Sequence, residues 1–176
     1  HSLLGALPNM VAARAARAFG LSGPALTVDT ACSSSLTAVH LACESLKRGE
    51  CDMAIAGGVQ VGLSMELLLS FRRAGLLSTA GRSRPFDEER DGFLLSEGGA
   101  VFVLETLDGA RRRGASILGV VESVGGSHDA HHPLRPDPEG RGLGDAVEQA
   151  LAEAGLVPSD IGYVNDKGEF HIVDRK

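Results

Sequence analysis

The segment VDTACSSS, residues 28–35, joins two different hydrophobic patterns. The apolar, β-branched run ALTV that leads into it predicts a strand over residues 25–31. Over residues 33–48 the apolar side chains instead recur at helical spacing, and Gly49 follows as a C-terminal stop signal. The sequence therefore places Cys32 at a sharp turn between a strand and the N-terminus of a helix.

The position of Cys32 supports two interpretations. Unpaired N–H groups at a helix N-terminus favour a thiolate, which is the nucleophilic form of the side chain and suits covalent acyl chemistry. Alternatively, Cys32 is a buried structural residue, because free cysteine is among the most buried residue types. The local sequence leaves both interpretations open. Cys43 and Cys51 are expected to be small core residues.

The composition is that of an ordinary globular protein, with 176 residues, 43% hydrophobic and 23% charged. A net charge of −6 argues against a nucleic-acid-binding protein, which usually has a basic face. No apolar run approaches the ~20 residues of a membrane span, and no signal peptide is visible. Three cysteines without a C-x-x-C pair favour a reducing compartment. We therefore expect a cytoplasmic protein that binds neither nucleic acid nor membrane.

Short helices and strands alternate along the chain, with glycines at many of their ends, which indicates an α/β protein. The loop-rich segments are 76–98 and 127–141. The predicted helices are 9–19, 33–48, 65–73 (with Ser64 as N-cap), 107–113 and 143–154, and the predicted strands are 25–31, 53–56, 100–105 and 117–124.

Several motifs in a fixed order resemble the β-ketoacyl synthases, the condensing enzymes of fatty-acid and polyketide assembly in the thiolase superfamily. The resemblance covers residues 1–165. The motifs that carry it are DTACSSSL (29–36), GECDMAIAGGV (49–59), GRSRPFD (81–87), DGFLLSEGGA (91–100), AGL (154–156) and IGYVN (161–165).

The resemblance implies a partial thiolase-like α/β/α/β/α sandwich. In that family the first half forms a five-stranded, mostly parallel sheet in the order 3-2-1-4-5, and the second half repeats it. This chain matches from just before the third strand, and the second half begins at about residue 116. The first two strands and most of the second half are absent from it. Because unpaired strands expose backbone groups and apolar faces, we expect the isolated segment to be poorly stable or prone to aggregate.

The resemblance also implies a function. Cys32 occupies the position of the cysteine that carries the acyl chain as a thioester before decarboxylative condensation with a malonyl group. The expected partners are an acyl carrier protein with its acyl and malonyl thioesters, and a second copy of the full-length protein, which pairs through the edge strand 25–31. No cofactor is expected beyond the phosphopantetheine arm of the carrier.

Other family features are missing. The family's first catalytic histidine is replaced by Lys167, which is a poor substitute for a neutral imidazole. The second histidine and one amide of the oxyanion hole would follow the last residue of the sequence. Full condensing activity is therefore not expected of this chain. The alternative is a non-catalytic pseudo-synthase or interaction module.

The tail, residues 160–176, resembles a hinge segment of AMP-forming acyl-CoA synthetases, with Asp160, Asp174 and Arg175 at matching positions. We therefore place a junction near Asn165, with 166–176 as a foreign tail. Alternatively, 165–168 is a hairpin turn and 170–173 a strand. The Ser/Thr/Gly-rich phosphate loop of the synthetases does not occur in the sequence, which argues against adenylation.

Two clusters have plainer explanations. His128, Asp129, His131 and His132 match no standard zinc spacing, so a solvated or pocket-rim loop is expected. The arginines 111–113 are typical of a solvated helix end, with docking of an acidic carrier protein as the alternative.

Overall fold

The computed structural model describes residues 4–5, 7–62, 64–85, 87–133 and 135–157, together with the backbone of 163–164 and 170–171. The chain divides into two units, His1–Gly109 and Ala110–Lys176. Helix α5 (Leu107–Arg112) crosses the boundary between them. Among the described residues, no helix combines the length and the apolar character needed to cross a bilayer.

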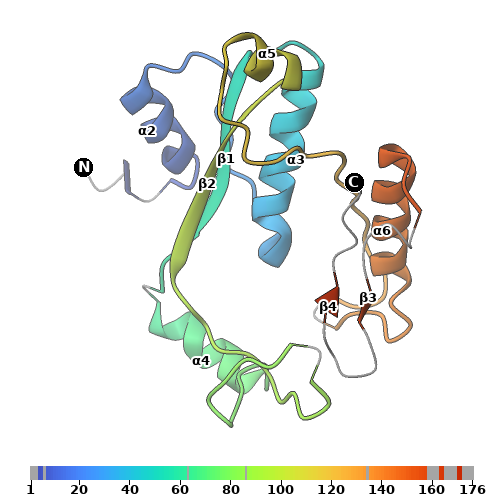
Figure 1. The fold of residues 1–176 in the computed structure, drawn as a ribbon. Helices are drawn as coiled ribbons and strands as arrows, with labels where there is room; N and C mark the ends of the chain where they lie inside the picture. Colours follow the sequence, from blue (N-terminus) through green and yellow to red (C-terminus); the bar gives the residue numbers. More distant parts are fainter. Residues whose placement is uncertain are drawn as a thin grey trace. The chain divides into compact units, whose positions relative to one another are not determined.

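The first unit is built around one helix and a two-stranded sheet. Strand β1 (Met53–Gln60) pairs antiparallel with β2 (Gly98–Glu105), and Ala56 lies opposite Phe102. Helix α3 (Ser34–Lys47) lies along β1, as Figure 1 shows. This unit also contains α2 (Met10–Phe19), the short 3-10 turn η1 (Ala31–Ser33) and α4 (Met65–Arg73).

Several predicted helix ends are confirmed. Helix α4 begins after Ser64, whose hydroxyl accepts a hydrogen bond from the Leu67 N–H at 3.2 Å. Helix α2 ends at Gly20, which adopts the left-handed conformation (φ 65°) that glycine tolerates best. In the second unit, α6 (Arg141–Ala154) ends at Gly155 as expected but begins two residues before the predicted start at 143.

A close approach of α3 to β1 depends on glycine. A Cβ atom on Gly58 would lie only 2.1 Å from Ser35 Oγ, so the first turn of α3 packs directly on the strand backbone. Further along the same two elements, Val39 and Ala56 are buried. This contact fixes the N-terminal end of α3 relative to β1.

The predicted strands at 25–31 and 117–124 are wrong, because residues 25–30 and 117–124 have no regular secondary structure and Ala31 begins η1. A strand is defined by its hydrogen-bonded ladder, and within the described residues neither segment pairs with another strand. The predicted strand 53–56 does form, but it continues through Gly57 and Gly58 to Gln60 because β2 pairs with its whole length.

In the second unit, the segment around 123–127 packs on α6 instead of entering a sheet. Ser123 Oγ donates to the Ala150 carbonyl at 2.6 Å, and Ser127 Oγ donates to the Gly142 carbonyl. The backbones of β3 (Tyr163–Val164) and β4 (Phe170–His171) form a short antiparallel pair. The alternative prediction of a strand at 170–173 therefore holds for its first two residues.

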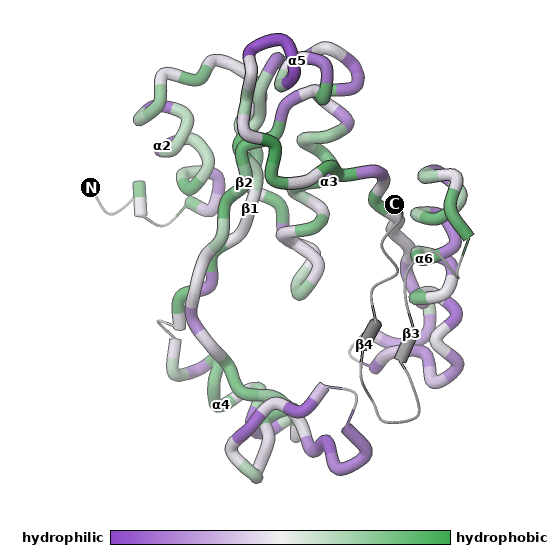
Figure 2. Tube along the Cα trace, viewed as in Figure 1, coloured by the Kyte–Doolittle hydropathy of each residue, from purple (hydrophilic) through white to green (hydrophobic). Residues whose placement is uncertain are grey.

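The sheet face opposite α3 is apolar and exposed. Side chains alternate between the two faces of a strand, and Ala56 faces α3, so its neighbour Ile55 lies on the opposite face. The partner of Ile55 in β2 is Val103. Val103 is 63% exposed and its neighbour on the same face, Val101, is 66% exposed. Figure 2 shows the hydrophobic character of both strands. The low stability expected for the isolated segment was based on such an exposed apolar face and on unpaired strand edges.

Candidate active site

Cys32 lies in η1, immediately before α3, and its side chain is exposed. The predicted placement at the N-terminal end of a helix is confirmed. The alternative of a buried structural cysteine is wrong for Cys32, because solvent reaches it. Cys43 and Cys51, expected in the core, are half-buried.

The backbone next to Cys32 is strained. Ala31 has φ 54°, in the left-handed region that residues with a side chain rarely adopt. Its N–H donates to Asp29 Oδ1 at 2.9 Å, which holds the peptide in place. The strain turns the chain sharply into η1, and the next residue is the cysteine.

Hydroxyl groups surround this turn. Ser33 Oγ donates to the Thr30 carbonyl at 2.8 Å, and Thr30 Oγ1 lies 3.0 Å from Thr37 Oγ1. Ser34 Oγ accepts from the Thr30 N–H at 2.9 Å and donates to the Ala31 carbonyl at 2.6 Å. The run of serines that marked a helix start in the sequence thus forms a local network around the cysteine.

An apolar hollow of about 380 Å³ lies between α3 and the sheet. Its walls include Leu36 and Val39 from α3 and Phe102 from β2. Cys32 does not line it. The hollow begins one helical turn beyond the thiol along α3. The thiol and the hollow are therefore neighbouring features of the first unit and do not form one site.

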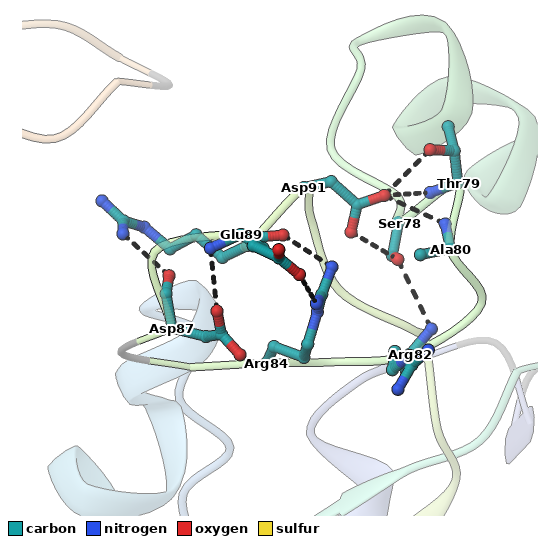
Figure 3. Close-up of polar contacts among 9 residues, drawn as sticks. Ser78, Thr79, Ala80, Arg82, Arg84, Asp87, Glu89 and Asp91 are labelled. Atoms are coloured by element: carbon teal, nitrogen blue, oxygen red, sulfur yellow. Dashed lines mark hydrogen bonds and ion pairs between the residues drawn. The ribbon is translucent and has the colours of Figure 1, made fainter. Parts of the chain in front are cut away.

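The loop that follows α4 is ordered by a single carboxylate, Asp91 (Figure 3). It accepts hydrogen bonds from Ser78 Oγ at 2.7 Å, from Thr79 N and Oγ1 both at 2.8 Å, and from Ala80 N at 3.0 Å. These bonds, led by the one from Ser78, hold the pKa of Asp91 well below its ordinary value. The sequence indicated only a loop here.

A second interaction orders the same loop. Arg84 pairs with Glu89 at 2.8 Å and also donates to the Glu89 carbonyl at 2.7 Å (Figure 3). Phe93 then packs edge-on against Phe71 of α4, with ring centroids 5.7 Å apart. The GRSRPFD and DGFLLSEGGA motifs therefore build one folded loop, in which distant residues of the sequence meet.

The histidine-rich loop uses its rings as local hydrogen-bond acceptors. His128 Nδ1 accepts from Ala130 N at 2.9 Å, and His132 Nδ1 accepts from Arg135 N at 3.2 Å. Across the described part of the chain, no three His, Cys, Asp or Glu side chains gather as a metal site. The buried Asp137 instead pairs with Arg141 Nε at 2.9 Å.

The remaining candidate residues of the sequence lie outside the described residues. They are Lys167, which was expected at the position of the family's first histidine, and Asp160, Asp174 and Arg175 of the tail.

Two family models match the chain. The N-terminal domain of β-ketoacyl synthases matches residues 1–110, and the C-terminal domain matches residues 118–169. The second match runs past Asn165, where the synthetase-like tail was placed, and no comparison supports the resemblance of that tail to acyl-CoA synthetases.

Curated relatives are polyketide synthases. The chain is 43% identical over 168 residues to a pikromycin polyketide synthase component of Streptomyces venezuelae, covering 96% of this chain and 11% of that protein. It is 43% identical over 164 residues to an erythronolide synthase of Saccharopolyspora erythraea, covering 93% and 5%. Mycoketide-CoA synthase of Mycobacterium tuberculosis is 42% identical, with 94% and 4% covered. The chain thus spans about a tenth or less of the length of these relatives.

Solved structures agree with the sequence matches. The oxazolomycin ketosynthase domain of Streptomyces albus superposes with a TM-score of 0.82 at 38% identity, covering 89% of this chain and 28% of that one. A type II ketosynthase bound to a hexaketide and to its acyl-carrier protein gives 0.81 at 28% identity, covering 88% and 40%. The fold is therefore a part of the thiolase-like α/β fold, and the chain belongs to the β-ketoacyl synthase family of enzymes.

Proposed function

We propose that Cys32 is the acyl-accepting nucleophile of a condensing enzyme in polyketide synthesis. The observation that carries this proposal is the exposed thiol on a strained turn directly before α3, within the residues matched by the family's N-terminal domain. A nucleophile needs access to its substrate and a defined direction of attack, and this turn supplies both.

The first step is a thioester exchange. The Cys32 thiolate attacks the carbonyl carbon of an acyl group on a phosphopantetheine arm, and a new carbon–sulfur bond forms. The tetrahedral intermediate then expels the phosphopantetheine sulfur, which leaves as a thiolate and takes up a proton.

The second step is the condensation. A malonyl thioester loses carbon dioxide, and the electron pair of the broken bond becomes a carbanion equivalent. This carbon attacks the acyl carbonyl on Cys32, a carbon–carbon bond forms, and the Cys32 thiolate is released. The chain's own part in this step is to present the acyl group, because Lys167 stands where the family has its first histidine.

The partner in this proposal is an acyl carrier protein that delivers both thioesters on its own arm, with no further cofactor. One structural neighbour is a ketosynthase in complex with such a protein, which supports the assignment. Arg72 and Arg73 at the end of α4 are exposed and would attract an acidic carrier. The proposal extends to a homodimer of the full-length protein.

The proposed domain comprises residues 1–165, with the second half of the fold beginning at about residue 116. The family match continues to residue 169, so a separate tail would begin after that residue. The gap between the two family matches, from residue 111 to residue 117, includes the proposed start of the second half.

A second candidate function is a non-catalytic synthase-like module. Lys167 in the histidine position favours it, because a protonated lysine is a poor replacement for imidazole. This candidate would keep the fold and the carrier-binding surface without acyl transfer.

Acylation of Cys32 separates the two candidates. The chain is incubated with an acyl N-acetylcysteamine thioester, which presents the thioester end of phosphopantetheine, and its intact mass is measured. We expect one acyl adduct, located on Cys32 by peptide mapping, that is lost in Cys32→Ser and kept in Cys43→Ser. An unmodified chain at saturating thioester would support the non-catalytic module.

A further inference from the structure

Ser34 makes two hydrogen bonds that enclose the turn before Cys32. Its hydroxyl accepts from the N–H of Thr30 and donates to the carbonyl of Ala31. The two backbone groups lie on either side of the peptide unit that links Thr30 to Ala31. One side-chain oxygen therefore ties both ends of the segment that leads into the cysteine.

The segment that Ser34 ties is the strained one. Ala31 has a positive φ, and such a conformation persists only where its surroundings hold it. Asp29 holds the Ala31 N–H, and Ser34 holds the Ala31 carbonyl, with both its hydroxyl and its backbone N–H. If the hydroxyl were lost, the Thr30 N–H would lose the partner that the structure gives it, and rotation about Ala31 would redirect Cys32.

Ser33 makes hydrogen bonds to Thr30 alone. The carbonyl and the hydroxyl of Thr30 both accept from Ser33 Oγ, at 2.8 and 2.9 Å. Neither of these bonds reaches Ala31. Among the side-chain hydroxyls that the structure describes in this turn, Ser34 is thus the one that forms a hydrogen bond with each of the two residues before Cys32.

We propose that Ser34 is a positioning residue, which fixes the direction of the Cys32 thiol for acyl transfer. The proposal rests on the proposed role of Cys32 as nucleophile. Its physical basis is that a displacement of about 1 Å in a reacting group can lower a rate by up to about 100-fold. Because both hydrogen bonds of Ser34 Oγ go to the backbone before Cys32, we expect its removal to act on the rate of acyl transfer and not on substrate binding.

The test measures the initial rate of Cys32 acylation against the concentration of an acyl N-acetylcysteamine thioester. We expect Ser34→Ala to lower the maximal rate about tenfold or more, with the half-saturating concentration changed less than about twofold. Ser34→Thr keeps a hydroxyl and should restore the rate. Ser34→Val has nearly the shape of threonine without the hydroxyl and should behave like Ser34→Ala.

Ser45→Ala is the matched control. Ser45 lies on the same helix, and its hydroxyl also makes a side-chain hydrogen bond, to Glu50 Oε2 at 2.8 Å. Its removal should leave the acylation rate unchanged. Circular dichroism of every variant reports whether α3 is still formed, and if Ser34→Ala does not fold, the comparison of Ser34→Thr with Ser34→Val decides.

The outcomes are distinct. A maximal rate for Ser34→Ala within about twofold of the unsubstituted chain would overturn the positioning role while leaving Cys32 as nucleophile. Equal losses in Ser34→Thr and Ser34→Val would also overturn it, because the hydroxyl would then be irrelevant. If the unsubstituted chain takes up no acyl group, the proposed function itself fails and this inference fails with it.

Discussion

The two faces of the β1–β2 sheet have different surroundings. On the α3 face, Ala56 is 6% exposed and Gly58 lies under Ser35. On the other face, Val101 and Val103 are larger and more hydrophobic, yet both are mostly exposed. Hydrophobicity alone therefore does not identify the core of this unit. What decides burial is direct contact with α3, which packs on one face and mainly along β1. Phe102 lies on that same face in β2 and is still 58% exposed.

The largest expected effect comes from the buried side of α3. Leu46 is buried, and Leu46→Ala should lower the free energy of unfolding by about 2–5 kcal/mol, because it leaves a cavity. The measurement is the urea midpoint of the helical circular dichroism signal. Leu36→Ala is the matched control on the same helix, and since Leu36 is 66% exposed its effect should be below about 0.5 kcal/mol. Equal effects at both positions would mean that α3 does not pack as described.

Gly58→Val tests the contact between α3 and β1. A Cβ at this position would meet Ser35 at 2.1 Å, so the substitution should cost about 1–3 kcal/mol by overpacking. Gly98→Val is the control in the partner strand, where a Cβ would meet nothing within 4 Å. Thermal unfolding of the two variants should place Gly58→Val clearly lower. A higher melting temperature for Gly58→Val than for Gly98→Val would contradict the close approach.

The exposed face should tolerate polar residues. Val101→Thr combined with Val103→Thr replaces exposed methyl groups with hydroxyls and keeps β-branched side chains, so stability should change by less than about 0.5 kcal/mol. Aggregation, followed by light scattering at rising protein concentration, should decrease because the apolar patch is smaller. A large loss of stability would instead show that a part of the chain covers this face.

The smallest effect is expected at Asp91, which lies on neither face. Its pKa in the folded loop lies below the ordinary 3.8, so the unfolded loop binds more protons in acid. The contribution of Asp91 is therefore present above about pH 4 and is lost as the pH falls through the lowered pKa. Hydrogen exchange at the Thr79 and Ala80 amides, which donate to this carboxylate, should accelerate in acid relative to the trend of other loop amides.

Asp91→Asn should produce the same loss of protection at neutral pH, with Glu88→Gln as the control for removing an exposed charge in the same loop. The acylation of Cys32 should not change in either variant. Protection at Thr79 that is independent of both pH and Asp91 would show that other contacts order the loop.

Much of the first unit could be predicted from its sequence. Helix α4 and its Ser64 cap follow from local hydrogen-bonding rules, and the position of Cys32 follows from the change of pattern at residues 28–35. The strand predicted at 25–31 did not form, because a β-branched run still needs a neighbour to pair with. The Asp91 network could not be foreseen either, since its donors lie eleven to thirteen residues away from it in the sequence.

The family, several helix ends and the cysteine at a helix start could all be predicted from the sequence, because these depend on motifs and on contacts within a few residues. The exposure of Cys32, the two hydrogen bonds of Ser34 to the residues before it, and the packing of α3 on one face of the sheet emerged from the folded chain. The physical reason is that burial and hydrogen-bond geometry belong to pairs of surfaces. A hydrophobic pattern indicates which residues can be buried. Which of them are buried depends on the packing of α3 against β1.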